Sequence, residues 1–203
     1  MTTLTPRSVA ATLAAFTVGF SAAAMADDDR NDGDRFSARL SGFNEVHSAT
    51  ATSAERGAVS TQASGSFRAV IDNAASTIHY ELSYEGVGGR EGAVTQAHIH
   101  FGQRHTVGGI VVWLCQTTGT PAPAAVAAVT PFCPTPGGTV TGTITPAQVL
   151  TATGQGINSG EFDEVVRAIR AGATYANVHS TVFAPGEIRG RIERGDRGHH
   201  DRD

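Results

Sequence analysis

The chain of 203 residues has a formal net charge of −4, with 40% hydrophobic, 17% charged and 6% aromatic residues. All 15 basic side chains are arginines, which excludes a Schiff-base enzyme and a Walker-type phosphate loop, because both need a lysine. The charge is too low for a highly charged disordered chain, and the scattered arginines form no basic stripe for nucleic acid. One turn-rich globular domain with terminal extensions is therefore expected.

Residues 1–26 have the pattern of a secretory signal peptide. Arg7 supplies the positive start, residues 9–20 are largely apolar, and Ala24-Met25-Ala26 has the small-x-small sequence after which a signal peptidase cleaves. The apolar run is too short to span about 30 Å of hydrocarbon. We expect a periplasmic or secreted mature protein that begins at Asp27 and has no membrane span.

The mature chain is predicted to be one mainly β domain, residues 36–194, between two charged disordered tails, residues 27–35 and 195–203. Alternating apolar and polar residues and regular turns favour a Greek-key antiparallel β-sandwich or barrel of about eight strands. The unbroken β-branched run at 109–114 predicts a central strand. The expected strands are Phe36–Leu40, Gly65–Ile71, Ser76–Tyr84, Ala93–Phe101, Gly109–Leu114, Gly138–Thr145, Tyr175–Phe183 and Gly186–Arg194.

Two helical segments are expected between the strands. Thr145 followed by proline predicts a single turn that ends at Leu150. Asn158 and Glu161 resemble a capping box, and Gly172 is a natural stop for the helix that follows it. That helix is predicted to cover one end of the sandwich or barrel with apolar residues at i, i+3, i+4 and i+7, namely Phe162, Val165, Val166 and Ile169.

Cys115 and Cys133 are the only cysteines of the chain. An oxidising compartment favours a disulfide between them, which would close a proline-rich segment that packs poorly by itself. Closing a loop of this size contributes roughly 3 kcal/mol in the chain-entropy account. The alternative is a thiolate ligand of a metal ion.

The histidines are the one set of metal-binding or catalytically useful side chains that is concentrated in the sequence. His98 and His100 lie on one face of a predicted strand, with Ile99 on the other face. His179 ends a second strand, and His105 follows His100 across a short turn. Three or four imidazoles without thiolate or carboxylate fit copper or zinc, and fit magnesium or calcium badly. The alternative is a hydrogen-bonded histidine pair that orders the loops.

The other polar residues support simpler interpretations. His79 is predicted to face solvent, and His199-His200 in the charged tail is at best a weak chelator. Arg189 belongs to a half-buried strand whose polar face, with cross-strand ion pairs, is formed by Glu187, Arg189 and Arg191. Alternatively, Arg189 holds an anion near the histidines. No nucleophile elbow, zinc-protease helix or Ser/His/Asp set is present, so no catalytic residues are predicted.

The sequence resembles the CHRD domain, which is named for repeats in chordin and is common in single-domain bacterial exported proteins. The similarity covers about Phe36 to Ile192 in the order of the family. At His47 the sequence departs from the family, which usually continues with proline. The matching segments are Leu40–Val46, Ala97–Gly102, Gly109–Leu114, Tyr175–Ser180 and Pro185–Ile192.

A more distant similarity is to Cu/Zn superoxide dismutases, which are Greek-key β-barrels with a His-x-His strand and a later strand ending in histidine. That similarity implies His98 and His100 as a first copper pair and His179 as a late ligand, with His105 as a poor match for the remaining one. The zinc loop is missing and the cysteines are placed differently, so the similarity does not carry dismutase activity.

Three hypotheses follow, in order of preference. The first is an exported CHRD-domain protein that binds a copper-like ion, with zinc as alternative, through His98, His100 and His179, with His105 nearby. The second is a non-catalytic module that binds an extracellular protein or matrix partner. The third is a redox enzyme similar to superoxide dismutase.

Overall fold

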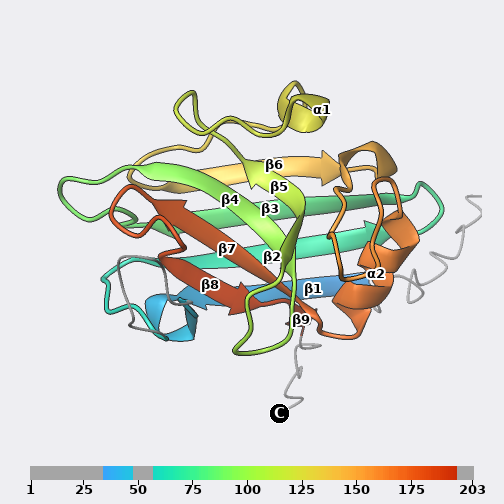
Figure 1. Ribbon diagram of the computed structural model, residues 1–203, viewed down its shortest axis with the longest axis horizontal. Coiled ribbons are helices and arrows are strands. Elements are labelled where there is room, and N and C mark those ends of the chain that lie inside the picture. The colour runs from blue at the N-terminus through green and yellow to red at the C-terminus, as the bar shows by residue number, and fades with distance from the viewer. Residues whose placement is uncertain (1–33, 48–56, 196–203) are drawn as a thin grey trace, which may run out of the picture. The chain divides into compact units, whose positions relative to one another are not determined.

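The computed structural model describes residues 34–47 and 57–195, so the predicted signal peptide and most of both tails lie outside the described residues. Its strands form one antiparallel sheet that is nearly closed into a barrel (Figure 1). The hydrogen-bonded order is β5-β4-β7-β8-β1-β2-β3-β6, with β9 paired to β1. The strands are β1 (Arg35–Ser41), β2 (Ser64–Asp72), β3 (Thr77–Glu85), β4 (Val94–Phe101), β5 (Gly109–Cys115), β6 (Gly138–Ile144), β7 (Thr174–Ser180), β8 (Ile188–Arg191) and β9 (Glu193–Arg194).

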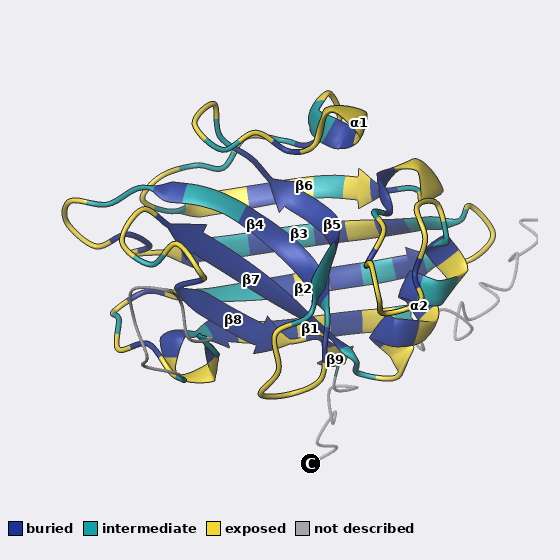
Figure 2. Ribbon diagram, viewed as in Figure 1, coloured by how far each residue is buried: buried dark blue, intermediate teal, exposed yellow. Residues whose placement is uncertain are grey.

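The mainly β antiparallel fold is confirmed, and each expected strand has a counterpart, although Gly186–Arg194 forms two short strands, β8 and β9. The prediction of a central strand at 109–114 is wrong. Strand β5 lies at one end of the hydrogen-bonded order. Its apolar run is continuous because both faces are covered (Figure 2). Val112 and Leu114 belong to the main core, while Trp113 packs outside it with Ala122 and Val126. Burial on two faces, and not a central position, explains this sequence.

The inner face of the barrel holds the main hydrophobic core. In β4, Ile99 points inward and is fully buried, as Val178 and Ile188 are in β7 and β8. Across the barrel, Phe67 and Leu82 of β2 and β3 belong to the same cluster. Full burial of each such side chain contributes roughly 1.5–3 kcal/mol, so this face supplies most of the driving force for folding.

Helix α2 (Phe162–Arg170) buries its predicted apolar stripe in the main core and ends before Gly172, whose φ of 63° is left-handed. The Glu161 carboxylate accepts a hydrogen bond from the Asn158 backbone N–H at 2.8 Å, but this contact closes a turn that precedes the helix. The turn expected after Thr145 is a short 3-10 helix, Pro146–Gln148, with a capping box. Helix α1 (Ala124–Ala127), inside the cysteine loop, was not predicted.

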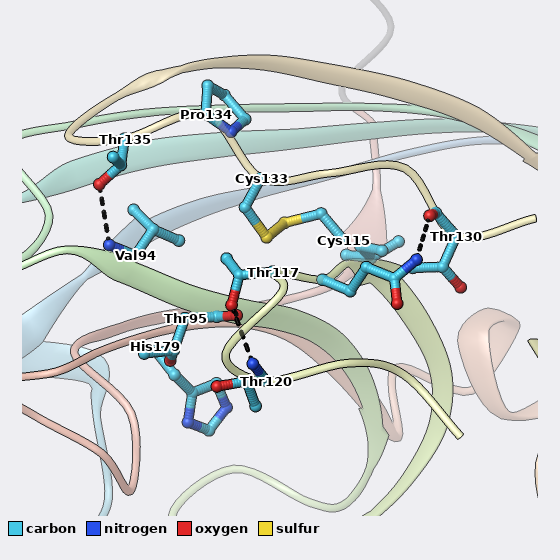
Figure 3. The surroundings of a disulfide bond; sticks show 12 residues. Val94, Thr95, Cys115, Thr117, Thr120, Thr130, Cys133, Pro134, Thr135 and His179 are labelled. Carbon is cyan, nitrogen blue, oxygen red and sulfur yellow. Dashed lines mark hydrogen bonds between the residues drawn. A yellow bond between two sulfur atoms is a disulfide. The ribbon is translucent and has the colours of Figure 1, made fainter. Parts of the chain in front are cut away.

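The predicted disulfide between Cys115 and Cys133 is confirmed (Figure 3). The loop it closes is better packed than its composition predicts, because the buried side chain of Gln116 organises it. The Gln116 amide donates to the carbonyl oxygens of Ala127 and Thr130 at 2.7 and 2.6 Å and accepts from the Ala122 N–H at 2.9 Å. The loop therefore forms a fixed cover over the outer face of β5.

The ends of the domain extend slightly into the predicted tails. Asp34 forms an ion pair with Arg170 at 2.8 Å, and Arg35 begins β1. At the other end, the Gly195 N–H donates to the Arg35 carbonyl at 2.9 Å. Among the described residues, no helix has both the length and the apolar character needed to cross a bilayer.

Candidate metal centre

Two neighbouring strands bring three histidines together on the outer face of the barrel. In the register of β4 and β7, His98 is opposite Asn177 and Gln96 is opposite His179. His179 is therefore a diagonal neighbour of His98, within reach of its side chain. His100 shares the face of His98, as the strand alternation predicted.

The three imidazoles are buried and close to one another. His98 is 0%, His100 7% and His179 6% exposed. The centroid of the His98 ring is 5.4 Å from that of His100 and 4.9 Å from that of His179. One nitrogen of each ring lies within 4.8 Å of the others, a spacing that can hold a metal ion.

Main-chain carbonyls fix the orientation of two of these rings. Nδ1 of His100 lies 2.9 Å from the Gly108 carbonyl oxygen, and Nδ1 of His179 lies 2.9 Å from that of Ala184. Because a carbonyl only accepts, Nδ1 of both neutral rings carries the proton. Nε2 of each ring therefore has its lone pair available, which is the arrangement typical of metal-ligating histidines.

His98 completes the cluster through its Nδ1, which lies 3.3 Å from Nε2 of His179. Since Nε2 of His179 is unprotonated, Nδ1 of His98 donates to it in the metal-free arrangement. Nε2 of His98 and Nε2 of His100 are buried and have no hydrogen-bond partner within the described part of the chain. Buried polar atoms without partners are rare and costly, and the unprotonated Nε2 of His100 favours a missing partner at this site.

Burial keeps the three histidines neutral. Desolvation lowers the pKa of His98 well below its ordinary value, with smaller contributions from His179 and His100. Burial lowers the pKa of His100 to about 4 against the hydrogen bond to Gly108, and it also lowers the pKa of His179. All three rings are therefore uncharged near neutral pH, and only uncharged imidazole coordinates a metal.

Aromatic side chains enclose the cluster. The Trp113 ring meets the His98 ring edge to face at 4.4 Å between centroids. Tyr175 stacks on His100 at 4.8 Å with an interplanar angle of 2°, and the Arg189 guanidinium lies 4.0 Å from the centroid of the Tyr175 ring. The disulfide loop covers Trp113 from outside, so the loop prevents solvent from reaching this wall of the site.

A buried polar pair supports the strand that carries His179. The Asn177 side-chain amide donates to Oε2 of Glu45 at 2.6 Å and to the Ile188 carbonyl at 2.9 Å. Burial raises the pKa of Glu45, although hydrogen bonds from the Val46 N–H and from Asn177 oppose this shift. The pair ties β7 to β8 and to the segment after β1.

Sequence reasoning assigned no role to several residues of this site. Tyr175 and Asn177 alternate with His179 along β7, so the same period-two argument that joined His98 and His100 would have found them. Glu45 was noted only as part of a motif. The Gly108 and Ala184 carbonyls could not be found, since no side chain marks them.

His105 does not join the cluster. Its backbone φ of 62° is left-handed, its side chain is exposed, and it lines a cleft on the other side of Tyr175. The carbonyl of Gly108, in the same loop, approaches His100 instead. The prediction that His79 faces solvent is confirmed, since its exposed ring contacts Thr143 Oγ1 at 3.0 Å.

The predicted polar face of the last long strand is wrong in part. Glu187 and Arg189 are both buried, and no ion pair joins them to a neighbouring strand within the described residues. Glu187 accepts hydrogen bonds from Thr61 Oγ1 at 2.6 Å and from the Gly88 N–H at 2.8 Å. Only Arg191 is exposed, and it pairs with Glu193 at 3.3 Å. Loops cover the outer face here, so alternation does not predict exposure.

Fold and site together define an antiparallel β-barrel domain with a buried three-histidine cluster on its outer face. The family model of the CHRD domain matches residues 36–192, which is most of the chain. The chain therefore belongs to the CHRD domain family, as the sequence motifs predicted. No curated protein and no solved structure matches it.

Proposed function

We propose that this CHRD-domain protein binds one transition-metal ion, copper or alternatively zinc, outside the cytoplasm. The ligands are Nδ1 of His98 and Nε2 of His100 and His179. The observation that carries the proposal is the fixed orientation of two of these rings: each donates an Nδ1–H hydrogen bond to a main-chain carbonyl, which leaves its Nε2 unprotonated.

The spacing of the nitrogens supports a shared ion. With metal–nitrogen bonds of about 2.0–2.1 Å, two ligands on a tetrahedral ion are roughly 3.3 Å apart. His98 Nδ1 and His179 Nε2 are 3.3 Å apart. For His98 to coordinate through Nδ1, its proton moves to Nε2, which then carries a buried N–H without an acceptor among the described residues.

The donor set favours a copper-like ion. Imidazole suits copper and zinc, whereas magnesium and calcium need oxygen ligands. Structural zinc sites have four protein ligands, and this cluster supplies three. The positive charge of nearby Arg189, which helps to lower the pKa of His100, disfavours a highly charged ion.

Burial favours holding the ion over using it in turnover. All three histidines are nearly inaccessible, and the walls are formed by Trp113 and Tyr175. The metal-capable group contains no carboxylate that would act as an acid or base. We therefore assign the protein a role in binding or buffering the metal. The predicted signal peptide and the disulfide, which fits an oxidising compartment, support its location outside the cytoplasm.

The test is metal analysis of untagged protein purified from the exported fraction, followed by copper and zinc titration of the metal-free form. We expect one tight site. The double variant His98→Ala/His100→Ala should lose it, whereas His199→Ala/His200→Ala, which removes the same number of imidazoles, should keep it. Equal affinity of the first variant and the parent would contradict the proposal and leave the partner-binding module as the better hypothesis.

A further inference from the structure

A cleft of about 380 Å³ lies on the opposite side of Tyr175 from His100. It is bounded by β1, by β8 and β9, and by the loop that follows β4. Its charged lining consists of five arginines and one carboxylate: Arg39, Arg104, Arg189, Arg191, Arg194 and Glu193.

This lining is strongly positive in a chain whose formal net charge is −4. Glu193 is shared between two of the arginines, at 3.3 Å from Arg191 and 3.8 Å from Arg104. Arg39 and Arg189 have no carboxylate within ion-pair distance among residues 34–47 and 57–195, although Arg189 interacts electrostatically with the buried carboxyl of Glu45. A concave surface of one charge sign concentrates ions of the opposite sign.

The floor of the cleft contains a buried guanidinium with unused donors. Arg189 is 4% exposed, and Nη1 donates to the Thr106 carbonyl at 2.9 Å. The Tyr175 ring covers its face at 4.0 Å. A guanidinium has five N–H donors, so most of them remain for a ligand in the cleft.

Tyr175 adds a neutral donor beside this guanidinium. Its hydroxyl oxygen accepts the Gly108 N–H at 3.2 Å, so its own proton remains to be donated. Burial and loop contacts fix both Arg189 and Tyr175 before any ligand arrives. Such preorganised donors lose little entropy on binding.

We propose that this cleft binds a small oxyanion carrying several negative charges, of the phosphate-ester or polycarboxylate class. Arginine forks recognise such groups through paired, charge-assisted hydrogen bonds. The volume is that of a small-molecule site, and the single carboxylate in the lining is already engaged by two arginines. The proposal does not depend on the metal, because none of the three clustered histidines lines the cleft.

The test is calorimetric titration of metal-free protein with pyrophosphate and with citrate at low ionic strength. We expect one site, with the tighter of the two anions identifying the ligand class. The exposed pair Arg39→Gln/Arg104→Gln should weaken binding at least about tenfold, because it removes two guanidinium groups from the rim. The matched control Arg68→Gln/Arg167→Gln removes the same charge elsewhere on the surface and should bind within about twofold of the parent.

Two outcomes would overturn the proposal: no saturable binding of either anion, or equal weakening by both double variants, which would indicate nonspecific attraction. Because pyrophosphate and citrate also chelate metals, the titration is repeated on His98→Ala/His179→Ala, which keeps the His100 ring that stacks on Tyr175. Anion binding by this variant that equals binding by the parent assigns the anion to the cleft. Loss of anion binding in the variant would show that the anion needs the histidines, which would contradict a cleft site separate from the metal centre.

Discussion

The two faces of β4 and β7 are built on the same strands and have opposite chemistry. Inward, Ile99 and Val178 join an apolar core that is fully buried. Outward, His98, His100 and His179 are almost as well buried, but beneath loops and aromatic rings. The inner face explains why the chain folds, and the outer face contains buried polar groups that the fold does not need.

This difference shows where to look for function in such a barrel. Burying an imidazole costs free energy unless both nitrogens find partners. Two of the three rings satisfy Nδ1 on a main-chain carbonyl, and in the described chain Nε2 of His98 and Nε2 of His100 have no partner. Apolar residues at these positions would cost less free energy to bury, so the three histidines mark the outer face as the candidate functional site.

The largest expected effect comes from the inner face. Ile99→Ala should lower the free energy of unfolding by about 4 kcal/mol, through lost burial and a residual cavity. Metal affinity measured on the folded fraction should stay within about threefold, because the backbone of β4 remains paired on both sides. Urea denaturation measures the first quantity. A variant that loses metal binding while it is folded would break the separation of the faces.

Removal of the disulfide tests the cover of the outer face. The double variant Cys115→Ser/Cys133→Ser should lower the free energy of unfolding by about 3 kcal/mol, since the closed loop spans a sequence separation of 18. Trp113 is the only tryptophan, so its fluorescence reports directly on this cover. A shift of its emission to longer wavelength in the folded variant is expected. Unchanged emission would show that the loop packs without its disulfide.

The dependence of stability on acid pH tests the buried histidines of the outer face. The pKa of His100 is about 4 in the folded protein and near 6.5 when unfolded, so the unfolded chain binds more protons between these values. The free energy of unfolding of the metal-free protein therefore has its full value above about pH 6.5 and falls as the pH decreases toward 4. His100 accounts for at most about 3 kcal/mol of this decrease.

Denaturant titrations at a series of pH values measure this slope. His100→Phe should flatten it, whereas His79→Gln, at an exposed strand position, should keep the slope of the parent. An equally steep slope in His100→Phe would contradict the assignment of the acid sensitivity to the buried cluster.

The smallest effect is expected from Tyr175→Phe. The variant keeps the ring that stacks on His100 but leaves the Gly108 N–H without its acceptor. The loss of this hydrogen bond should lower the free energy of unfolding by about 1 kcal/mol. Metal affinity should change by less than about threefold, because the stacking face is intact. Thermal unfolding and metal titration check the two parts. A large loss of metal affinity would mean that the hydroxyl positions the Gly108 loop.

Much of the fold was predictable because its information is local. Alternation located the strands, and the i, i+3, i+4 spacing located α2. The same alternation placed His98 and His100 on one face, and the end of a second predicted strand pointed to His179. Exposure was not predictable, because it depends on loops: Arg189 and Glu187 are buried under segments distant in sequence, and His105 turns away in a left-handed conformation.

The central claim is most directly tested by NMR of protein labelled with ¹⁵N in its histidines and titrated with zinc as the diamagnetic ion. At one equivalent, we expect shifts in the ring nitrogens of His98, His100 and His179, with coordination through Nδ1 of the first and Nε2 of the other two. Shifts confined to His79, His105 or the tail pair His199-His200 would contradict the account.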